Sequence, residues 1–141
     1  MGDQLKTPTP FLKWAGGKRA LLPKLLESVP GEFETYYEPF LGAGSLFFAL
    51  PRNVNKKISD FNVELISTYR TIGANVEGFL SELIELRNSK EDYLRIRAWD
   101  RESDFENRSA ESRAARFIYL NKCGFNGLYR VNKQGFYNVP Y

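Results

Sequence analysis

A glycine-rich stretch near the start of the chain has the sequence pattern of a ligand-binding turn. Residues 38–47 read EPFLGAGSLF, and a strand followed by Gly42-x-Gly44 and a helix lets the backbone approach a ligand closely. Asp60 follows at the end of a second expected strand, where an acidic side chain typically binds ribose hydroxyls. The alternative is that the glycines only form a packing turn and that Asp60 caps the next helix.

A second cluster, FLKWAGGK at residues 11–18, places Trp14 beside lysines and two glycines. The face of a tryptophan ring attracts cations, among them the sulfonium of S-adenosylmethionine. A sulfonium ligand also suits residues 38–47 better than a pyrophosphate. Phe47 stands where the dinucleotide fingerprint has its third glycine, and no Gly-Lys-Ser/Thr follows. The alternative for residues 11–18 is a core tryptophan with solvated lysines.

The C-terminal stretch LNKCGFNGLYRVNKQGFYNVPY, residues 120–141, places aromatic side chains beside arginine and asparagine in turn-like sequence. Its alternation around residues 132–135 predicts a β-hairpin. The alternative is that Phe125, Leu128 and Tyr129 are simply core residues. The charges between Arg87 and Arg116 are mixed in sign, which favours a solvated helix surface there.

These stretches need elements to position them. Periodicity and turn residues predict a short helix near 18–29 with Pro23 in its first turn, a helix over 62–72 and a helix that begins at an N-cap on Ser109. Gly73 is expected to interrupt the helical pattern, and residues 1–10 to form a loose arm. The full set of expected elements is strands at 35–38 and 56–60 and helices at 18–29, 45–50, 62–72, 76–88, 90–102 and 109–124.

The composition limits the possible functions. The chain of 141 residues suits one domain by length, and its net charge of +3 only weakly suggests nucleic acid. It has no histidine and one cysteine, so histidine catalysis, a disulfide within the chain and a structural zinc site are excluded, and no metal is expected. No signal peptide or membrane span is visible, which favours a cytoplasmic protein.

Four blocks in order resemble Dam-like DNA adenine-N6 methyltransferases (D12 class, α-group). They are FLKWAGGK, EPFLGAGSLFF, SDFN and LNKCGFNGLYRVNKQGFYNVPY, and the resemblance covers roughly residues 10–72 and 113–141. It implies an α/β, Rossmann-like S-adenosylmethionine-dependent methyltransferase fold with a partial sheet. An inserted helical target-recognition domain would end in a β-hairpin. We expect residues 1–72 to form the N-terminal part of the cofactor domain and residues 73–141 the recognition domain.

The resemblance also implies site residues, double-stranded DNA as partner and S-adenosyl-L-methionine as cofactor. Arg130 matches the residue that reads a guanine, and guanidinium is the best bidentate partner for guanine O6 and N7. Phe125 matches an aromatic that wedges into the duplex and supports extrusion of the target adenine. The expected cofactor-binding residues are Trp14, Lys18, Glu38, Pro39, Phe40, Gly42, Gly44 and Asp60. The expected DNA-binding residues are Lys13, Phe125, Asn126, Leu128, Arg130 and Pro140.

The catalytic tetrapeptide of this family, Asp-Pro-Pro-Tyr, does not occur in the sequence, so no catalytic residue is assigned. The nearest match, Asn138-Val139-Pro140-Tyr141, lacks the first proline and directly follows the expected hairpin. We therefore expect an N-terminal portion of the fold that is inactive alone. It would be a truncation, half of a split enzyme, or a piece of a longer polypeptide, with the missing half or a second copy as partner. The alternatives are a catalytically dead DNA-binding module, or a cofactor-binding fold that methylates RNA or a small molecule.

Overall fold

The computed structural model describes residues 8–141, which form two compact units. Unit 1 comprises residues 8–11 and Gly16–Phe61, and unit 2 comprises Leu12–Ala15 and Asn62–Tyr141. Residues 1–7 of the expected N-terminal arm lie outside the described residues.

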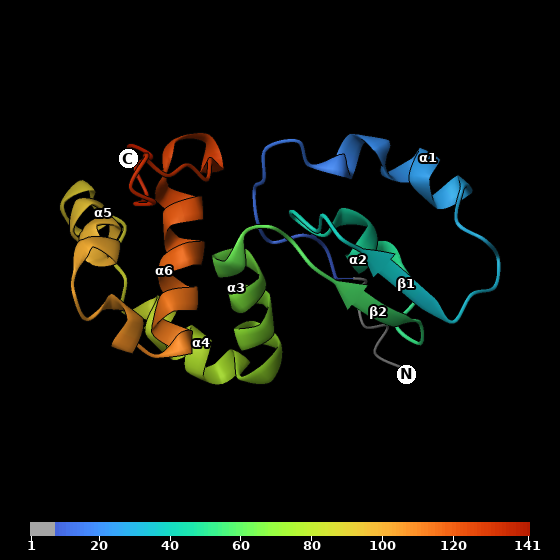
Figure 1. Ribbon diagram of the computed structural model, residues 1–141, viewed down its shortest axis with the longest axis horizontal. Helices are drawn as coiled ribbons and strands as arrows, with labels where there is room; N and C mark the ends of the chain where they lie inside the picture. Colours follow the sequence, from blue (N-terminus) through green and yellow to red (C-terminus); the bar gives the residue numbers. More distant parts are fainter. Residues whose placement is uncertain (1–7) are drawn as a thin grey trace, which may run out of the picture. The chain divides into compact units, whose positions relative to one another are not determined.

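Unit 1 contains a small parallel sheet. Strand β1 (Thr35–Glu38) pairs with β2 (Asn55–Ile58) from Thr35↔Asn55 to Glu38↔Ile58, and Figure 1 shows the two arrows side by side in the same direction. The bond from Ser59 N–H to Glu38 O (2.9 Å) continues the pairing beyond the strands. β1 has the expected bounds, whereas β2 ends at Ile58 and not at residue 60. The described part of unit 1 is thus mixed α/β with two strands.

Short helices flank this sheet in the sequence. A 3-10 turn η1 (Lys18–Leu21) leads into α1 (Leu22–Glu27), whose first turn contains Pro23 as expected. Helix α2 (Ser45–Ala49) follows the glycine-rich turn. Lys56 Nζ donates to the carbonyls of Phe47 and Leu50 (both 2.9 Å), so it occupies carbonyls that the short helix leaves without a partner inside the helix. Burial lowers the pKa of Lys56.

Unit 2 is helical and is organised around α6 (Ala110–Cys123). Helices α3 (Val63–Ala74), α4 (Val76–Ile84) and α5 (Lys90–Arg97) all contact α6, and Figure 1 shows α6 between α5 and α3. Each helix begins at a side-chain cap, which accepts a backbone N–H of the first turn. The caps are Asn62, Asn75, Ser89 and Ser109. No helix in residues 8–141 is long and apolar enough to cross a membrane.

The expected interruption at Gly73 is wrong. Gly73 lies inside α3, and the chain changes direction two residues later at Asn75. Asn75 N–H donates to Thr71 O (2.8 Å), and its side chain accepts from Gly78 N–H (3.0 Å). A single asparagine therefore closes one helix and caps the next.

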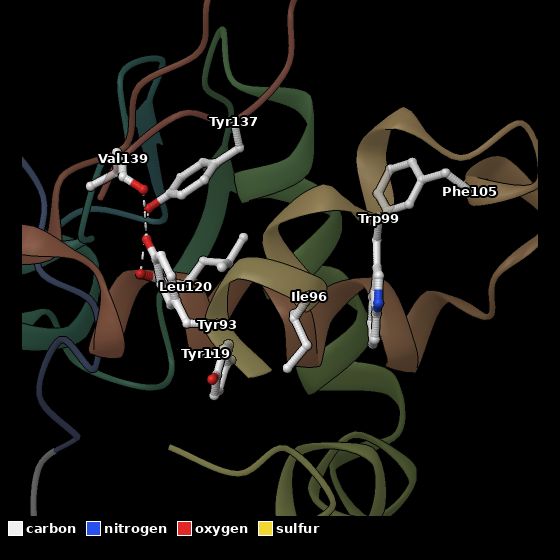
Figure 2. Close-up of a cluster of buried hydrophobic side chains, with 8 residues drawn as sticks. All are labelled: Tyr93, Ile96, Trp99, Phe105, Tyr119, Leu120, Tyr137 and Val139. Atoms are coloured by element: carbon white, nitrogen blue, oxygen red, sulfur yellow. Dashed lines mark hydrogen bonds between the residues drawn. The ribbon is translucent and has the colours of Figure 1, made fainter. Parts of the chain in front are cut away.

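The core of unit 2 is aromatic. Tyr93 and Ile96 of α5 are fully buried, and they pack with residues of α6 and of the C-terminal segment. Figure 2 shows Tyr93 and Tyr137 reaching toward each other. The Tyr93 hydroxyl donates to Val139 O (3.0 Å), and the Tyr137 hydroxyl donates to Leu128 O (2.9 Å). The cluster comprises Tyr93, Ile96, Trp99, Phe105, Tyr119, Leu120, Tyr137 and Val139. Short 3-10 turns complete the unit: η2 (Ala98–Arg101), η3 (Phe105–Asn107) and η4 (Phe125–Gly127).

The expected β-hairpin forms only in part. We call residues 128–140 the hairpin segment. It folds back on itself through the bonds from Asn132 N–H to Phe136 O (2.8 Å) and from Asn138 N–H to Arg130 O (3.0 Å). The described residues here form one isolated antiparallel bridge, between Val131 and Tyr137, in place of two strands. The hairpin segment is therefore a return loop.

Candidate functional sites

Lys18 and Glu38 join the end of β1 to the glycine-rich turn in unit 1. Lys18 Nζ donates to Glu38 Oε1 (3.3 Å) and to Phe40 O (3.0 Å). Glu38 is 5% exposed, and its second oxygen, Oε2, has no hydrogen-bond partner within residues 8–141. A buried carboxylate oxygen without a donor is costly, so Oε2 marks a place where a ligand N–H or O–H would be stabilised. Beside it, burial raises the pKa of Tyr36.

The glycine-rich turn is held by Asp60. Gly42 and Gly44 both adopt left-handed backbone angles, with φ of 53° and 70°, which glycine adopts without strain. Gly42 N–H donates to Asp60 Oδ2 (2.9 Å), so the carboxylate fixes the turn at the carboxyl end of the sheet. The alternative that Asp60 caps the next helix is wrong, because Asn62 Oδ1 accepts the Leu65 N–H (2.9 Å) in that role.

Unit 1 thus brings together seven of the eight expected cofactor residues. Two carboxylates, an exposed Phe40 ring and a turn of left-handed glycines lie at the end of the strands. This set could hold a ligand that carries an amino group, hydroxyls and an aromatic ring. The seven residues are Lys18, Glu38, Pro39, Phe40, Gly42, Gly44 and Asp60.

Trp14, the eighth expected cofactor residue, belongs to unit 2. Its ring stacks on Tyr129 (centroids 5.6 Å apart, 27° between planes) and on Phe117 (6.2 Å, 25°). Tyr129 also meets Tyr137 edge to face (5.6 Å). Tyr129, which sequence reasoning left without a role, is therefore the centre of an aromatic stack that includes Trp14. A cofactor contact for Trp14 stays a prediction.

An exposed turn follows α6. We call residues 124–128 the apical turn. Phe125 is 55% exposed, although its N–H donates to Pro140 O (2.8 Å). Asn126 has a φ of 54°, which is uncommon for a residue other than glycine. Leu128 is half-buried against the core of unit 2, and a DNA contact for it stays a prediction. The apical turn presents an apolar ring and an amide on a fixed backbone.

Arg130 lies on the exposed side of the hairpin segment and is fixed by Asn138. Its Nε donates to Asn138 Oδ1 (2.7 Å) and its Nη2 to Asn138 O (3.2 Å). Lys13 also belongs to unit 2 and is exposed, and its main chain bonds to Asn121 of α6. The six expected DNA contacts therefore all lie in unit 2.

The prediction of a solvated surface between Arg87 and Arg116 is wrong for Arg116, which is buried. Arg116 is 6% exposed and donates to Ile96 O (3.0 Å) and Arg97 O (2.8 Å). Burial lowers the pKa of Arg116, and the ion pair with Asp100 (3.0 Å) opposes that effect.

Asp100 also fixes the hairpin segment, because its carboxylate accepts the Tyr137 N–H (2.7 Å). Arg97 Nη1 donates to Val139 O (3.1 Å), and Arg101 Nη2 donates to Tyr137 O (3.0 Å). The mixed signs of charge along the sequence did not show which of these side chains bond to the hairpin segment. The spacing of residues 97, 100 and 101 could have indicated their shared role, because side chains at these intervals lie on one side of a helical turn.

Comparisons with known proteins agree on one family. The family described as "D12 class N6 adenine-specific DNA methyltransferase" matches residues 14–141. The chain is 46% identical to the type II methyltransferase M1.LlaDCHI of Lactococcus lactis subsp. cremoris, over 94% of this chain and 47% of the relative. It is 40% identical to M.MjaIII of Methanocaldococcus jannaschii (94% and 51%) and 36% identical to the DNA adenine methylase of Escherichia coli K12 (97% and 49%). The chain spans about half the length of these curated relatives.

Proposed function

Because the chain belongs to the family of D12 class N6 adenine-specific DNA methyltransferases, we propose that it supplies the cofactor-binding and DNA-recognition parts of such an enzyme. In this proposal unit 1 binds S-adenosylmethionine and unit 2 recognises a short site in double-stranded DNA, similar to GATC. The domain boundaries expected from the sequence, 1–72 and 73–141, belong to the same proposal, with a Rossmann-like fold for the complete cofactor domain.

The observation that carries the proposal is the convergence of the expected residues in unit 1. Lys18, Glu38 and Asp60 come from three separate stretches, yet hydrogen bonds join all three to the glycine-rich turn or to the strand that leads into it. A packing turn alone would not require a buried carboxylate with one oxygen lacking a donor among the described residues. The alternative of a packing turn alone therefore leaves this buried oxygen unexplained.

The residues of unit 1 fit S-adenosylmethionine by chemistry. Glu38 Oε2 is a buried acceptor suited to the amino group of the methionine part. Asp60 is an acid suited to ribose hydroxyls, and it also fixes the turn through Gly42 N–H. The exposed ring of Phe40 offers a surface for stacking. When bound, the cofactor supplies the methyl group on its sulfonium.

On the DNA side, unit 2 offers what base reading and base extrusion require. Phe125 is an exposed ring whose backbone is anchored to Pro140, which suits insertion into the duplex. Arg130 is exposed and oriented by Asn138, which suits a guanine edge. We propose that Asn126 and Leu128 contact neighbouring bases, that Pro140 contacts DNA from the hairpin segment, and that Lys13 contacts DNA outside the core site.

We further infer that the 141-residue chain does not methylate adenine by itself. Methyl transfer to N6 needs an acceptor for the amino protons and a ring that stacks on the flipped base. The family supplies both from Asp-Pro-Pro-Tyr, which is absent from this sequence. A segment outside these 141 residues would have to supply them. Tritium transfer from labelled cofactor to an unmethylated GATC duplex tests this inference, and clear turnover by the pure chain would contradict it.

Calorimetric titration with S-adenosylhomocysteine tests the proposed cofactor site. We expect binding by the wild-type chain and its loss in Asp60→Ala. Asp104→Ala, which removes an exposed acid in unit 2, is the matched control and should bind like the wild type. Equal binding by Asp60→Ala and the wild type would contradict the proposal. Specific DNA binding without any binding of S-adenosylhomocysteine would favour a catalytically inactive DNA-binding module.

A further inference from the structure

A buried asparagine near the end of α6 joins two backbone stretches that are far apart in the sequence. Asn121 is 3% exposed. Its Nδ2 donates to Lys13 O (2.7 Å) and to Gly127 O (2.9 Å), and its Oδ1 accepts from Lys13 N–H (3.0 Å). One amide therefore uses both of its donors and its acceptor on main-chain groups. We call this arrangement the Asn121 clamp.

Gly127 permits the close approach that the clamp needs. Its φ is +65°, and a Cβ built on it would lie 2.5 Å from Lys13 Cβ and 2.6 Å from Lys13 Cδ. Such distances are far below van der Waals contact, and Lys13 Cβ is held next to its own backbone, so a larger residue would push the two stretches apart. The glycine is required here by the neighbour as well as by the backbone angle.

The residues beside the clamp face outward. Lys13 and Asn126 are exposed, and Phe125 is 55% exposed. Trp14, next to Lys13, stacks on Phe117 and Tyr129 and so fixes the same stretch a second time. The clamp is thus buried, but what it positions is a surface made of Leu12–Ala15 and the apical turn.

We propose that Asn121 is a positioning residue for DNA recognition. It holds Lys13 beside the apical turn so that the lysine and Phe125 meet the duplex in one fixed register. This inference rests on the proposed function, because it takes Lys13 and the apical turn as DNA contacts. A purely structural role would affect folding stability alone, whereas a positioning role changes the discrimination between DNA sequences.

The test measures a ratio of affinities. Fluorescence anisotropy gives the affinity for a duplex that contains GATC and for a duplex with one base pair of that site replaced. Asn121→Asp keeps the shape and the acceptor for Lys13 N–H but places oxygen against both carbonyls. We expect the affinity ratio to fall roughly tenfold or more, while circular dichroism still shows a folded chain.

A glycine pair separates the clamp from general backbone strain. Gly127→Ala and Gly135→Ala both place alanine at a positive φ, but a Cβ at Gly135 meets no atom within 4 Å. We expect Gly127→Ala to lose discrimination and Gly135→Ala to keep it. If both clamp variants, Asn121→Asp and Gly127→Ala, fold and keep the wild-type ratio, the inference is overturned.

Two further outcomes also decide the matter. A wild-type chain without preference for GATC would overturn the proposed DNA recognition itself, and the positioning role with it. If neither clamp variant folds, hydrogen exchange of the wild type decides. Slow exchange of Lys13 N–H supports the clamp, and exchange at the rate of an unstructured peptide overturns it.

Discussion

At the scale of single residues, the two oxygens of Glu38 have different surroundings. Oε1 pairs with Lys18, while Oε2 is buried without a partner among the residues that the structure describes. A charged acceptor in this state costs stability when no ligand is present. Buried groups that lower stability in this way are commonly found at binding sites, because a bound ligand supplies the missing hydrogen bond.

Glu38→Gln therefore has opposite consequences for folding and for binding. We expect the free energy of unfolding to stay within about 1 kcal/mol of the wild type or to rise, because the charge is removed and Lys18 is 42% exposed. Affinity for S-adenosylhomocysteine should fall roughly tenfold or more, since a charged acceptor for its amino group is lost. Urea unfolding and calorimetry measure the two effects. Unchanged binding would show that Oε2 does not meet the ligand.

Cys123 offers a test of burial at the end of α6. Burial raises the pKa of its thiol, so the reactive thiolate is scarcer at neutral pH than in an ordinary cysteine. We expect slow reaction with a disulfide reagent at pH 7, and a rate that rises only at a higher pH than for a free thiol. In concentrated urea the reaction should become fast. An equal rate in the folded and unfolded chain would contradict this packing.

For the expected cofactor residues, residue types predicted where they lie better than what they contact. Asp60 and the glycines of residues 42–44 lie together as the spacing indicates. That Asn62, and not Asp60, caps α3 depends on backbone angles that composition does not reveal. The buried state of Arg116 was also hidden, because only the folded chain supplies the carbonyls and the Asp100 carboxylate that satisfy it.

At the scale of elements, side-chain caps define where the helices of unit 2 begin. Asn62→Ala removes the acceptor for Leu65 N–H at the start of α3. We expect it to lower the free energy of unfolding by about 1 kcal/mol, measured by urea unfolding. Asn107→Ala, at an exposed position in a 3-10 turn, is the control. Equal stability of the two variants would contradict the capping role.

Tyr93 ties α5 to the hairpin segment. Tyr93→Phe keeps the buried ring but removes the hydroxyl that donates to Val139 O and Pro140 O. We expect a loss of about 1 kcal/mol in the free energy of unfolding, because one buried hydrogen bond is lost while Val139 O keeps Arg97 as a donor. Tyr37→Phe, at a side chain that is 70% exposed, should change stability little. Equal losses in the free energy of unfolding of the two variants would contradict this role of the Tyr93 hydroxyl.

Elements that depend on local sequence signals were confirmed. The prediction was wrong where side chains, and not a second strand, are the hydrogen-bond partners of the backbone. The strand at 35–38 and the helix that begins after Ser109 formed as expected. The hairpin did not become two strands. The backbone groups of Tyr137 bond to Asp100 and Arg101, and Val139 O bonds to Arg97 and Tyr93. No alternation pattern reports such long-range side-chain bonds.

At the scale of the whole molecule, the two units differ in how their backbones are protected. The described sheet of unit 1 has two strands, and sheets of that size are marginal in water. In unit 2, α6 is buried along most of its length. We expect hydrogen exchange to be slowest in α6 and clearly faster in β1 and β2, and to slow in the strands when S-adenosylhomocysteine binds. Equal protection of the strands and α6 in the free chain would contradict this difference.

The central claim, that unit 2 reads a DNA sequence through Arg130, is tested most directly by replacing one atom of the DNA, the N7 of guanine, with a C–H group. Anisotropy compares a duplex containing GATC with the same duplex in which 7-deazaguanine replaces the guanine. We predict that the wild type loses about 1–3 kcal/mol on the modified duplex, and that Arg130→Ala binds both duplexes equally. Arg70→Ala, which removes an exposed arginine of α3, should keep the preference. Equal binding of the two duplexes by the wild type would contradict the claim.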